Sequence, residues 1–337
     1  METVSLDSSD MSRFSDFTIL TTTYKTVHGH EITTDILYPT ILSQAFEKTQ
    51  KTTNCPVILR YHGGGLISGY SLFAPFFNPW YLELSKEYSA IIVSPNYRLL
   101  PEATIFDILE DVEDHWNWMH KFLSQFLNEH TNGAIQPDLN RILTAGDSAG
   151  GYLSIQMGLS HPGQIRAVNA VYPLVDIKAP YFTDQTEKVI FSMPATPRDT
   201  LARHSREFRE REEVTNEKVV ISAPRDPERT RLMFSICQHG LLGQFFPGDA
   251  VELYPLERLD AGARFPRGGV LVLHGREDSV VPVEGSYMLK DKIDELDSDL
   301  RFRLVVRNGE HGFDHSAKLH DAWLWEAAQD VICSWLE

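Results

Sequence analysis

A serine between glycines is the feature that most constrains how this chain can fold. Residues 146–151 read GDSAGG, so that Ser148 follows the apolar run ILTA at 142–145 and precedes the helix-compatible segment YLSIQM at 152–157. Glycine on both sides of a serine permits a turn that is too tight for a side chain at either flank. We therefore expect a short buried strand, a sharp turn that exposes the Ser148 hydroxyl, and then a helix.

A serine hydroxyl is a weak nucleophile, so a chain that uses it needs a base, an acid that orients the base, and donors for an oxyanion. A second glycine-rich turn, HGGG at 62–65, follows the apolar segment PVILRY at 56–61. Bare glycine lets backbone N–H groups approach a charged oxygen without a Cβ atom in the way. An ordinary glycine turn is the alternative. We predict that the amides of Gly64, Gly65 and Ala149 form an oxyanion hole.

The acid is expected after a late strand, between the serine and the base in chain order. Asp278 occupies that place, because it follows the apolar run GVLVLH at 269–274 closely. Its neighbour Glu277 could take the same role, and a solvated acidic loop is the alternative to both. We predict that Asp278 is the acid that orients the base.

The base is expected after the last strand, where the chain has two histidines. His311 lies in a loop among glycines, where an imidazole can reach over the edge of a sheet. His315 falls near the start of the final helix, where an exposed or capping role is commoner. We predict that His311 is the base.

Apolar runs and helical patterns alternate along most of the chain. Strands are expected at 56–61, 90–94, 142–145, 167–172, 269–274 and 302–306, and helices at 105–128, 284–296 and 317–336. Such alternation predicts an α/β fold, with a mainly parallel central sheet flanked by helices. Two β-rich segments near the N-terminus, 17–24 and 31–38, predict an opening hairpin, and the polar residues 43–54 predict a loop.

The alternation stops between residues 176 and 265. This stretch holds many prolines, a charged helical run at 198–213 and aromatic residues between 233 and 246. Structureless loops of such length are uncommon in compact domains. We predict an inserted lid or cap there, on a core formed by residues 13–175 and 266–337, with residues 1–12 as a loose tail.

Composition and charge exclude several classes of protein. The 337 residues are 42% hydrophobic, which is enough for a packed core, and their formal net charge of −16 would repel nucleic acid and anionic membranes. There is no apolar run of about 18 residues, no signal-peptide pattern and no metal, phosphate-loop or dinucleotide motif. The three cysteines are scattered, without disulfide or metal spacing. We expect a cytoplasmic protein with no cofactor, no metal and no membrane span.

Four motifs in order are similar to those of the hormone-sensitive-lipase-like group of carboxylesterases, which have the α/β-hydrolase fold. They are HGGG at 62–65, YRLLPE at 97–102, Asp111 with Trp116, and GDSAGG at 146–151. The resemblance covers roughly residues 56–175 and 268–336. It implies that Asp147 is a motif residue and is not the acid of the triad.

The predicted reaction is the hydrolysis of a carboxylic ester through an acyl-enzyme intermediate, with Ser148, His311 and Asp278 as the triad. A small or medium, fairly apolar ester or lactone is the expected small-molecule substrate, since aromatic lid segments should line the pocket. One alternative is a dedicated acyltransferase, cyclase or thioesterase of a biosynthetic pathway. Another is a non-catalytic ligand receptor on the same fold. Loss of the catalytic histidine would mark that class, whereas this chain has His311. The oligomeric state and the acyl and alcohol groups stay open.

Overall fold

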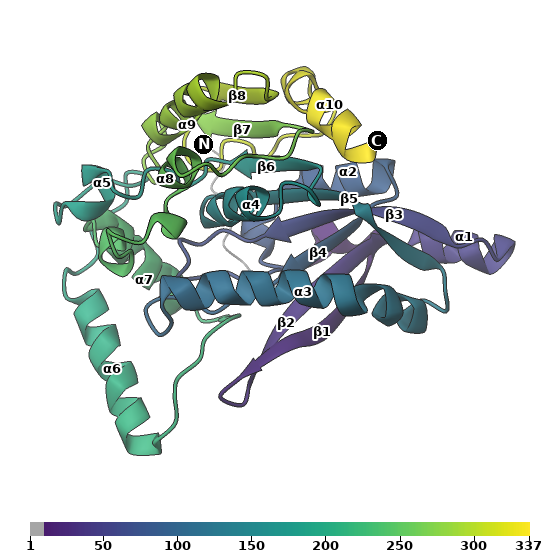
Figure 1. The fold of residues 1–337 in the computed structure, drawn as a ribbon. Coiled ribbons are helices and arrows are strands. Elements are labelled where there is room, and N and C mark those ends of the chain that lie inside the picture. The colour runs from purple at the N-terminus through teal and green to yellow at the C-terminus, as the bar shows by residue number, and fades with distance from the viewer. Residues whose placement is uncertain (1–9) are drawn as a thin grey trace.

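An eight-stranded sheet forms the centre of the computed structural model, which describes residues 10–337. The strands lie in the order β1-β2-β4-β3-β5-β6-β7-β8 (Figure 1). Their bounds are β1 Phe17–Val27, β2 His30–Pro39, β3 Thr53–Tyr61, β4 Ile91–Pro95, β5 Ile135–Asp147, β6 Ala167–Val171, β7 Val270–Gly275 and β8 Phe302–Arg307. β2 pairs antiparallel with β1 and β4, and the pairs from β4 to β8 are all parallel. The predicted opening hairpin and mainly parallel α/β sheet are confirmed.

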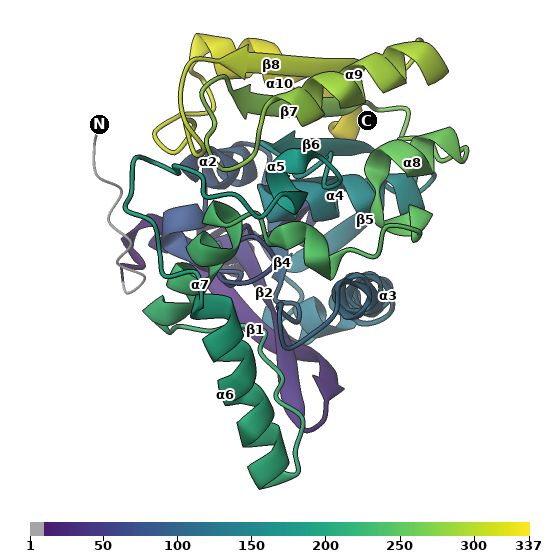
Figure 2. The same cartoon turned by 90° about the vertical axis from the view of Figure 1, so that its left-hand side faces the viewer.

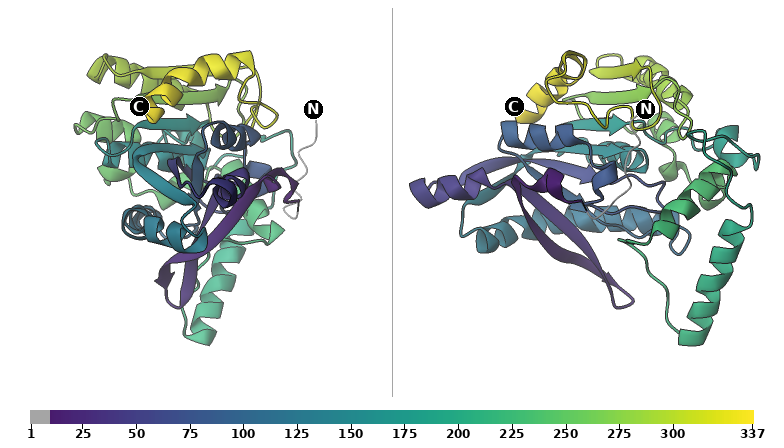
Figure 3. Two further views of the ribbon diagram at one scale, coloured as in Figure 1. Left: turned by 90° about the vertical axis from the view of Figure 1, so that its right-hand side faces the viewer. Right: turned by 180° about the vertical axis from the view of Figure 1, so that it is seen from behind.

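Helices cover both faces of this sheet (Figures 1 and 3). They are α1 Ile41–Thr49, α2 Pro79–Glu87, α3 Ile105–His130, α4 Ala149–Ser160, α5 Pro180–Thr183, α6 Thr200–Thr215, α7 Pro227–Gln238, α8 Pro255–Asp260, α9 Glu284–Leu296 and α10 Ala322–Leu336. Successive strand residues point to opposite faces. Ile91 accordingly packs in the cluster that contains the apolar faces of α1, α3, α4 and α9, whereas Ile92 packs in the one that contains α2 and α10.

α3 begins at a capping box in which the Thr104 and Asp107 side chains each bond to the backbone N–H of the other. It also carries Asp111, which is fully buried and holds the YRLLPE segment in place. The Asp111 carboxylate accepts hydrogen bonds from Arg98 N at 2.9 Å and Arg98 Nε at 2.8 Å. The residues that carry the resemblance therefore fasten a loop at the carboxyl ends of β3 and β4 to the helix layer.

Residues 176–265 connect β6 to β7 and contain α5, α6, α7 and α8 (Figure 2). α6 projects away from the sheet, while α8 lies beside α4 and α9. α7 is anchored by Arg229, whose guanidinium donates to Glu102 Oε1 at 2.7 Å and to the carbonyls of Ile67 and Leu100 at 2.8 and 2.7 Å. The charged run predicted to be helical at 198–213 forms α6, but the division of the segment from the core at residues 176 and 265 stays a prediction.

The chain before β3 contains a helix that was not predicted. The prediction of a loop at 43–54 is wrong, because residues 41–49 form α1 and β3 begins at Thr53. Leu42 and Phe46, four residues apart, lie on one face of α1 and pack against the core, which outweighs the polar composition. The predicted tail at 1–12 lies mostly outside the described residues; a 3₁₀ turn begins at Ser12 and buries Phe14. Within residues 10–337, no helix combines the length and the apolar character needed to cross a membrane.

Candidate active site

Ser148 stands between the end of β5 and the start of α4, with φ 57° and ψ −120°. Positive φ is uncommon for a residue with a side chain and persists only where the surroundings enforce it. Gly146 and Gly150 show how tight the turn is. A Cβ atom on Gly146 would lie 2.2 Å from the Gly150 carbonyl oxygen, and one on Gly150 would lie 2.1 Å from that of Tyr61. The predicted strand, sharp turn and helix are confirmed.

The HGGG turn follows β3 and lies against the serine turn. A Cβ atom on Gly63 would lie 3.0 Å from the Asp147 carbonyl oxygen, so the absence of side chains lets the two turns approach each other. Tyr97 of the YRLLPE segment donates a hydrogen bond from its hydroxyl to the His62 carbonyl at 2.6 Å, and its ring stacks on the imidazole of His62 at 4.3 Å. These contacts fix where the turn leaves the sheet.

Several backbone amides of these two turns donate no hydrogen bond in the described part of the chain. The predicted oxyanion donors, the N–H groups of Gly64, Gly65 and Ala149, are among them. Gly64 has φ 114° and Gly65 has φ 66°, and a Cβ atom on Gly64 would lie 2.1 Å from the Ser68 carbonyl oxygen. Gly64 and Gly65 line the same cavity as Ser148. Ala149, the residue after Ser148, is fully buried below it.

Asp278 and His311 meet at the carboxyl ends of β7 and β8. Asp278 Oδ2 lies 2.7 Å from His311 Nδ1, and Oδ1 accepts the backbone N–H groups of Val280 and Val281 at 2.9 and 2.8 Å. Burial alone would raise the pKa of Asp278, but the neighbouring His311 and hydrogen bonds from His274 and His311 outweigh it and lower the pKa well below its usual range. These contacts favour the ionised form of the buried carboxyl.

The two alternative residues have other partners. The Glu277 carboxylate is exposed and accepts the backbone N–H of Gly309. His315 Nδ1 lies 2.8 Å from the side-chain oxygen of Asn78, and burial lowers the His315 pKa to about 4. Neither Glu277 nor His315 takes part in the contact between Asp278 and His311. His315 does line the cavity, four residues after His311 in the chain.

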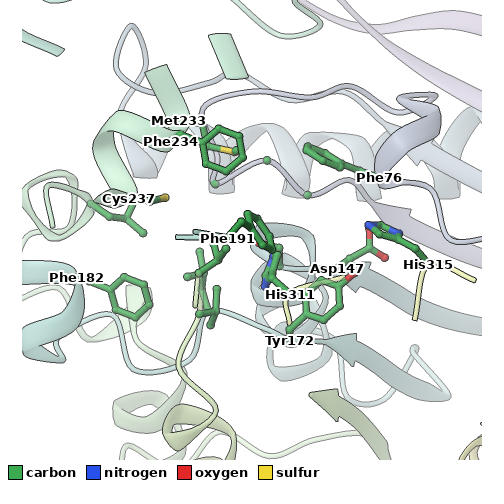
Figure 4. A pocket seen from close by; sticks show the side chains of 18 residues that line it. Phe76, Asp147, Tyr172, Phe182, Phe191, Met233, Phe234, Cys237, His311 and His315 are labelled. Atoms are coloured by element: carbon green, nitrogen blue, oxygen red, sulfur yellow. The ribbon is translucent and has the colours of Figure 1, made fainter. Parts of the chain in front are cut away.

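The cavity at Ser148 encloses about 710 Å³, part of it open to solvent, and we call it the catalytic pocket. Ser148, which is 8% exposed, and His311 both line it. Most of the remaining lining is apolar, and Figure 4 shows how the larger side chains surround the imidazole of His311. The apolar lining residues are Phe76, Tyr172, Leu174, Phe182, Phe191, Met233, Phe234, Leu242, Val280 and Val281. Several of them come from the 176–265 segment, as the sequence predicted for an aromatic lid.

Tyr172 is a site residue that the sequence reasoning missed. It follows β6 with φ 37°, and its ring lies against His311 with 4.2 Å between the ring centroids. Behind it, buried Asp314 accepts from Asn78 Nδ2 at 2.8 Å and from Trp80 Nε1 at 3.1 Å. Burial raises the pKa of Asp314 to about 6. The only sequence signal for Tyr172 was its place as the last residue of the strand predicted at 167–172.

Asp147, the residue before the serine, is buried and pairs with Arg60 of β3 rather than with a histidine. Arg60 Nη2 lies 2.8 Å from Asp147 Oδ2, and the guanidinium also rests over the Phe77 ring at 3.9 Å. Burial, opposed by Arg60, raises the pKa of Asp147 to about 6. This pair ties the serine turn to the neighbouring strand.

The described residues contain one group of carboxylates close enough together to hold a metal ion: Glu110, Asp111 and Asp114, on the face of α3. Lys25 Nζ lies within 2.9 Å of an oxygen of each of the three, and Arg98 pairs with Asp111 as well. These cations already neutralise the cluster, so its residues serve to join β1 and the YRLLPE segment to α3.

Comparisons with known proteins agree with the α/β-hydrolase fold. The family model described as "alpha/beta hydrolase fold" matches residues 58–232. A probable carboxylesterase, M8 of Phoma sp., is 31% identical over 331 residues, which cover 96% of this chain and 98% of the relative. A non-reducing polyketide synthase, ausA of Emericella nidulans, is 26% identical over 88% of this chain but only 13% of its own length.

Among solved structures, an esterase from the fungus Rhizomucor miehei superposes with a TM-score of 0.60 at 21% identity. The superposition covers 98% of this chain and 87% of that one, and at this identity it shows the fold alone. The matched family model and the carboxylesterase relative settle the assignment. The chain belongs to the α/β-hydrolase fold family and is a carboxylesterase-like hydrolase.

Proposed function

We propose that Ser148, His311 and Asp278 form a catalytic triad that hydrolyses carboxylic esters through an acyl-enzyme. The observation that carries this proposal is the 2.7 Å contact between Asp278 and His311, whose imidazole lines the same apolar pocket as Ser148. A buried, ionised carboxylate at Nδ1 of an imidazole leaves Nε2 free to accept a proton from a serine hydroxyl.

The reaction divides into two steps with the same groups. Ser148 Oγ attacks the ester carbonyl while its proton passes to Nε2 of His311, and the C–O bond to the alcohol breaks as His311 returns that proton to the leaving oxygen. Water then attacks the acyl-serine with His311 again as the base, which releases the acid and restores Ser148. Asp278 holds the tautomer of His311 and stabilises the imidazolium in both steps.

The amides of Gly64, Gly65 and Ala149 are the proposed oxyanion hole. All three belong to the turns that meet at Ser148, and they have no acceptor among residues 10–337. Oriented N–H groups in a site that excludes water stabilise a developing alkoxide more than they stabilise the neutral carbonyl. Their availability supplies the electrostatic part of this mechanism.

A small or medium, fairly apolar acyl group is the proposed substrate class. Phenylalanine side chains from the core and from the 176–265 segment line the pocket, namely Phe76, Phe182, Phe191 and Phe234. Apolar walls favour an alkyl or aryl group over a sugar or a peptide, because polar groups would lose their hydrogen bonds to water there.

A series of p-nitrophenyl esters of increasing acyl length tests the proposal. Wild type should hydrolyse them with an optimum that reports the size of the pocket, and Ser148→Ala should lose this activity while keeping the circular dichroism of the folded protein. A folded wild type that hydrolysed none of the esters and did not react with a fluorophosphonate would overturn the proposal.

Acyl transfer or thioester cleavage is the second candidate, and the similarity to a segment of polyketide synthases favours it. The same triad would accept an acyl group from a thioester and pass it to water or to another acceptor. Comparing matched oxygen esters and thioesters, with and without an added alcohol, separates the two. A thioester preferred at equal chain length, or a transfer product in excess of the acid, would favour this second candidate.

A cytoplasmic location is also a proposal. It rests on the three cysteines, Cys55, Cys237 and Cys333, which are free thiols in the structure, as is usual in a reducing compartment. Fractionation of cells that produce the protein, with a fluorescent fusion as a second readout, would test it. Recovery of the protein from the culture medium or the secretory pathway would contradict it.

A further inference from the structure

A second cavity lies beside the catalytic pocket, and the two share a wall at Phe234 of α7. It encloses about 1030 Å³, part of it open to solvent, and we call it the outer cavity. Ser68 and Phe73 line it from the core, and Met193 and Thr196 line it from the segment before α6. The first turns of α7 and the residues before them complete it. The outer cavity is therefore built from core and inserted segment together.

Aromatic side chains lie at the boundary between the two cavities. Phe73 lines the outer cavity and Phe76 lines the catalytic pocket, and their rings meet edge to face with 4.6 Å between centroids. On the α7 side, the half-buried Phe234 faces Phe191 of the catalytic pocket at 6.3 Å, and Figure 4 shows Phe234 beside Met233. A substrate chain that ran from Ser148 to the outer cavity would therefore pass Phe234, which lines both cavities.

The lining of the outer cavity carries positive charge, against the net charge of −16 of the whole chain. Arg225, Arg229 and Arg231 line it together with a single acid, Asp226. Arg229 is already paired with Glu102, and Asp226 accepts the backbone N–H at the start of α7. The two remaining guanidinium groups, those of Arg225 and Arg231, thus dominate the charge of the cavity.

These two arginines are weakly engaged. Among residues 10–337, the one ion pair of Arg231 is with Glu228 at 3.7 Å, and its side chain is 49% exposed. The Arg225 guanidinium lies over the ring of Tyr70 at 5.3 Å and acts electrostatically on the buried Asp35, and its N–H donors form no hydrogen bond among residues 10–337. A guanidinium has five donors in a planar fork that matches a carboxylate or a phosphate. The outer cavity thus offers an anion two such groups beside an aromatic wall.

We propose that the outer cavity binds an anionic group, a carboxylate or a phosphate, at the far end of the acyl chain of the substrate. The proposal rests on the function proposed above, since it places the ester bond at Ser148. We assign the anion to the acyl part of the substrate and not to the alcohol. The acyl chain stays bound through both acylation and deacylation, whereas the alcohol departs after the first step. Arg225 and Arg231 would bind the anion, and Phe234 would lie along the chain between anion and ester.

The test compares p-nitrophenyl esters of equal acyl length whose far end is a methyl ester, a carboxylate or a phosphate. Wild type should prefer the anionic esters by kcat/KM, and this preference should shrink as salt is added. The preference should fall about three- to fivefold in Arg225→Gln and in Arg231→Gln, and further in the double variant, as expected for partly exposed ion pairs. The larger preference among the two anions identifies the group that is bound.

Arg211→Gln is the matched control, because Arg211 is an exposed arginine of α6 that lines neither cavity. It should keep the preference of wild type. Equal preference in wild type and the double variant, with the neutral ester still hydrolysed, would overturn the assignment of the outer cavity. A wild type that hydrolysed none of the three esters would instead count against the proposed esterase function.

Discussion

Replacing Asp278 by asparagine tests whether this carboxylate sets the tautomer of His311. One carboxylate oxygen accepts the N–H groups of Val280 and Val281 at 2.9 and 2.8 Å, and the other lies 2.7 Å from His311 Nδ1. Asparagine keeps an acceptor for those two amides only by turning its own NH₂ group toward the imidazole. The imidazole must then accept at Nδ1 and carry its proton on Nε2, where it cannot take one from Ser148.

The expected loss in kcat/KM is about 10⁴-fold, or ~5 kcal/mol of transition-state stabilisation, because the oxyanion hole and the pocket are left intact. p-Nitrophenyl butyrate hydrolysis near neutral pH measures it, with thermal unfolding as a check on folding. Glu277→Gln is the matched control and should stay near wild type, since Glu277 bonds to the Gly309 amide and not to the imidazole. A smaller loss in Asp278→Asn than in Glu277→Gln would refute the reasoning.

Three further predictions concern the groups around the serine turn. Gly64→Ala should lower kcat about 10²- to 10³-fold in the same ester assay. The new Cβ atom would lie 2.1 Å from the Ser68 carbonyl oxygen and would displace a proposed oxyanion-hole amide. A wild-type rate in this variant would contradict the assignment of the Gly64 amide. Arg60→Met should lower the free energy of unfolding by about 3–5 kcal/mol in urea titrations, because it leaves Asp147 buried without its cation; an unchanged midpoint would count against that pairing. Burial raises the pKa of Asp314 to about 6 in the folded protein, so the unfolded chain loses this proton at a lower pH. The free energy of unfolding should therefore fall as pH rises from about 4 to 6, and Asp314→Asn should flatten this slope in unfolding measured across that range. Identical slopes for wild type and Asp314→Asn would argue against this role of Asp314.

The parts of the site that depend on local backbone geometry could be predicted from the sequence. In the turns around Ser148 and Gly64, a Cβ atom on Gly146, Gly150 or Gly64 would collide with nearby backbone, so the glycine pattern carries the information. The parallel sheet followed from the alternation of strands and helices. Because the carboxyl ends of parallel strands meet at one edge, chain order also brought Asp278 and His311 together after the neighbouring strands β7 and β8.

The rest of the site depends on contacts that no local pattern marks. Asn78 and Asp314 are 236 residues apart in the chain yet share a buried hydrogen bond, and Tyr172 owes its place against His311 to that part of the core. The outer cavity forms only where the segment before α6 and the start of α7 fold over the core. Such positions are set by tertiary packing, which composition and periodicity do not encode residue by residue.

The most direct test of the central claim is to identify by mass spectrometry which residue a fluorophosphonate modifies. The triad predicts one adduct per wild-type chain, on the peptide that contains Ser148, and none in folded Ser148→Ala. His311→Ala should react far more slowly, since it lacks the base. An adduct on another serine, or none on a folded wild type, would contradict the assignment of Ser148 as the nucleophile.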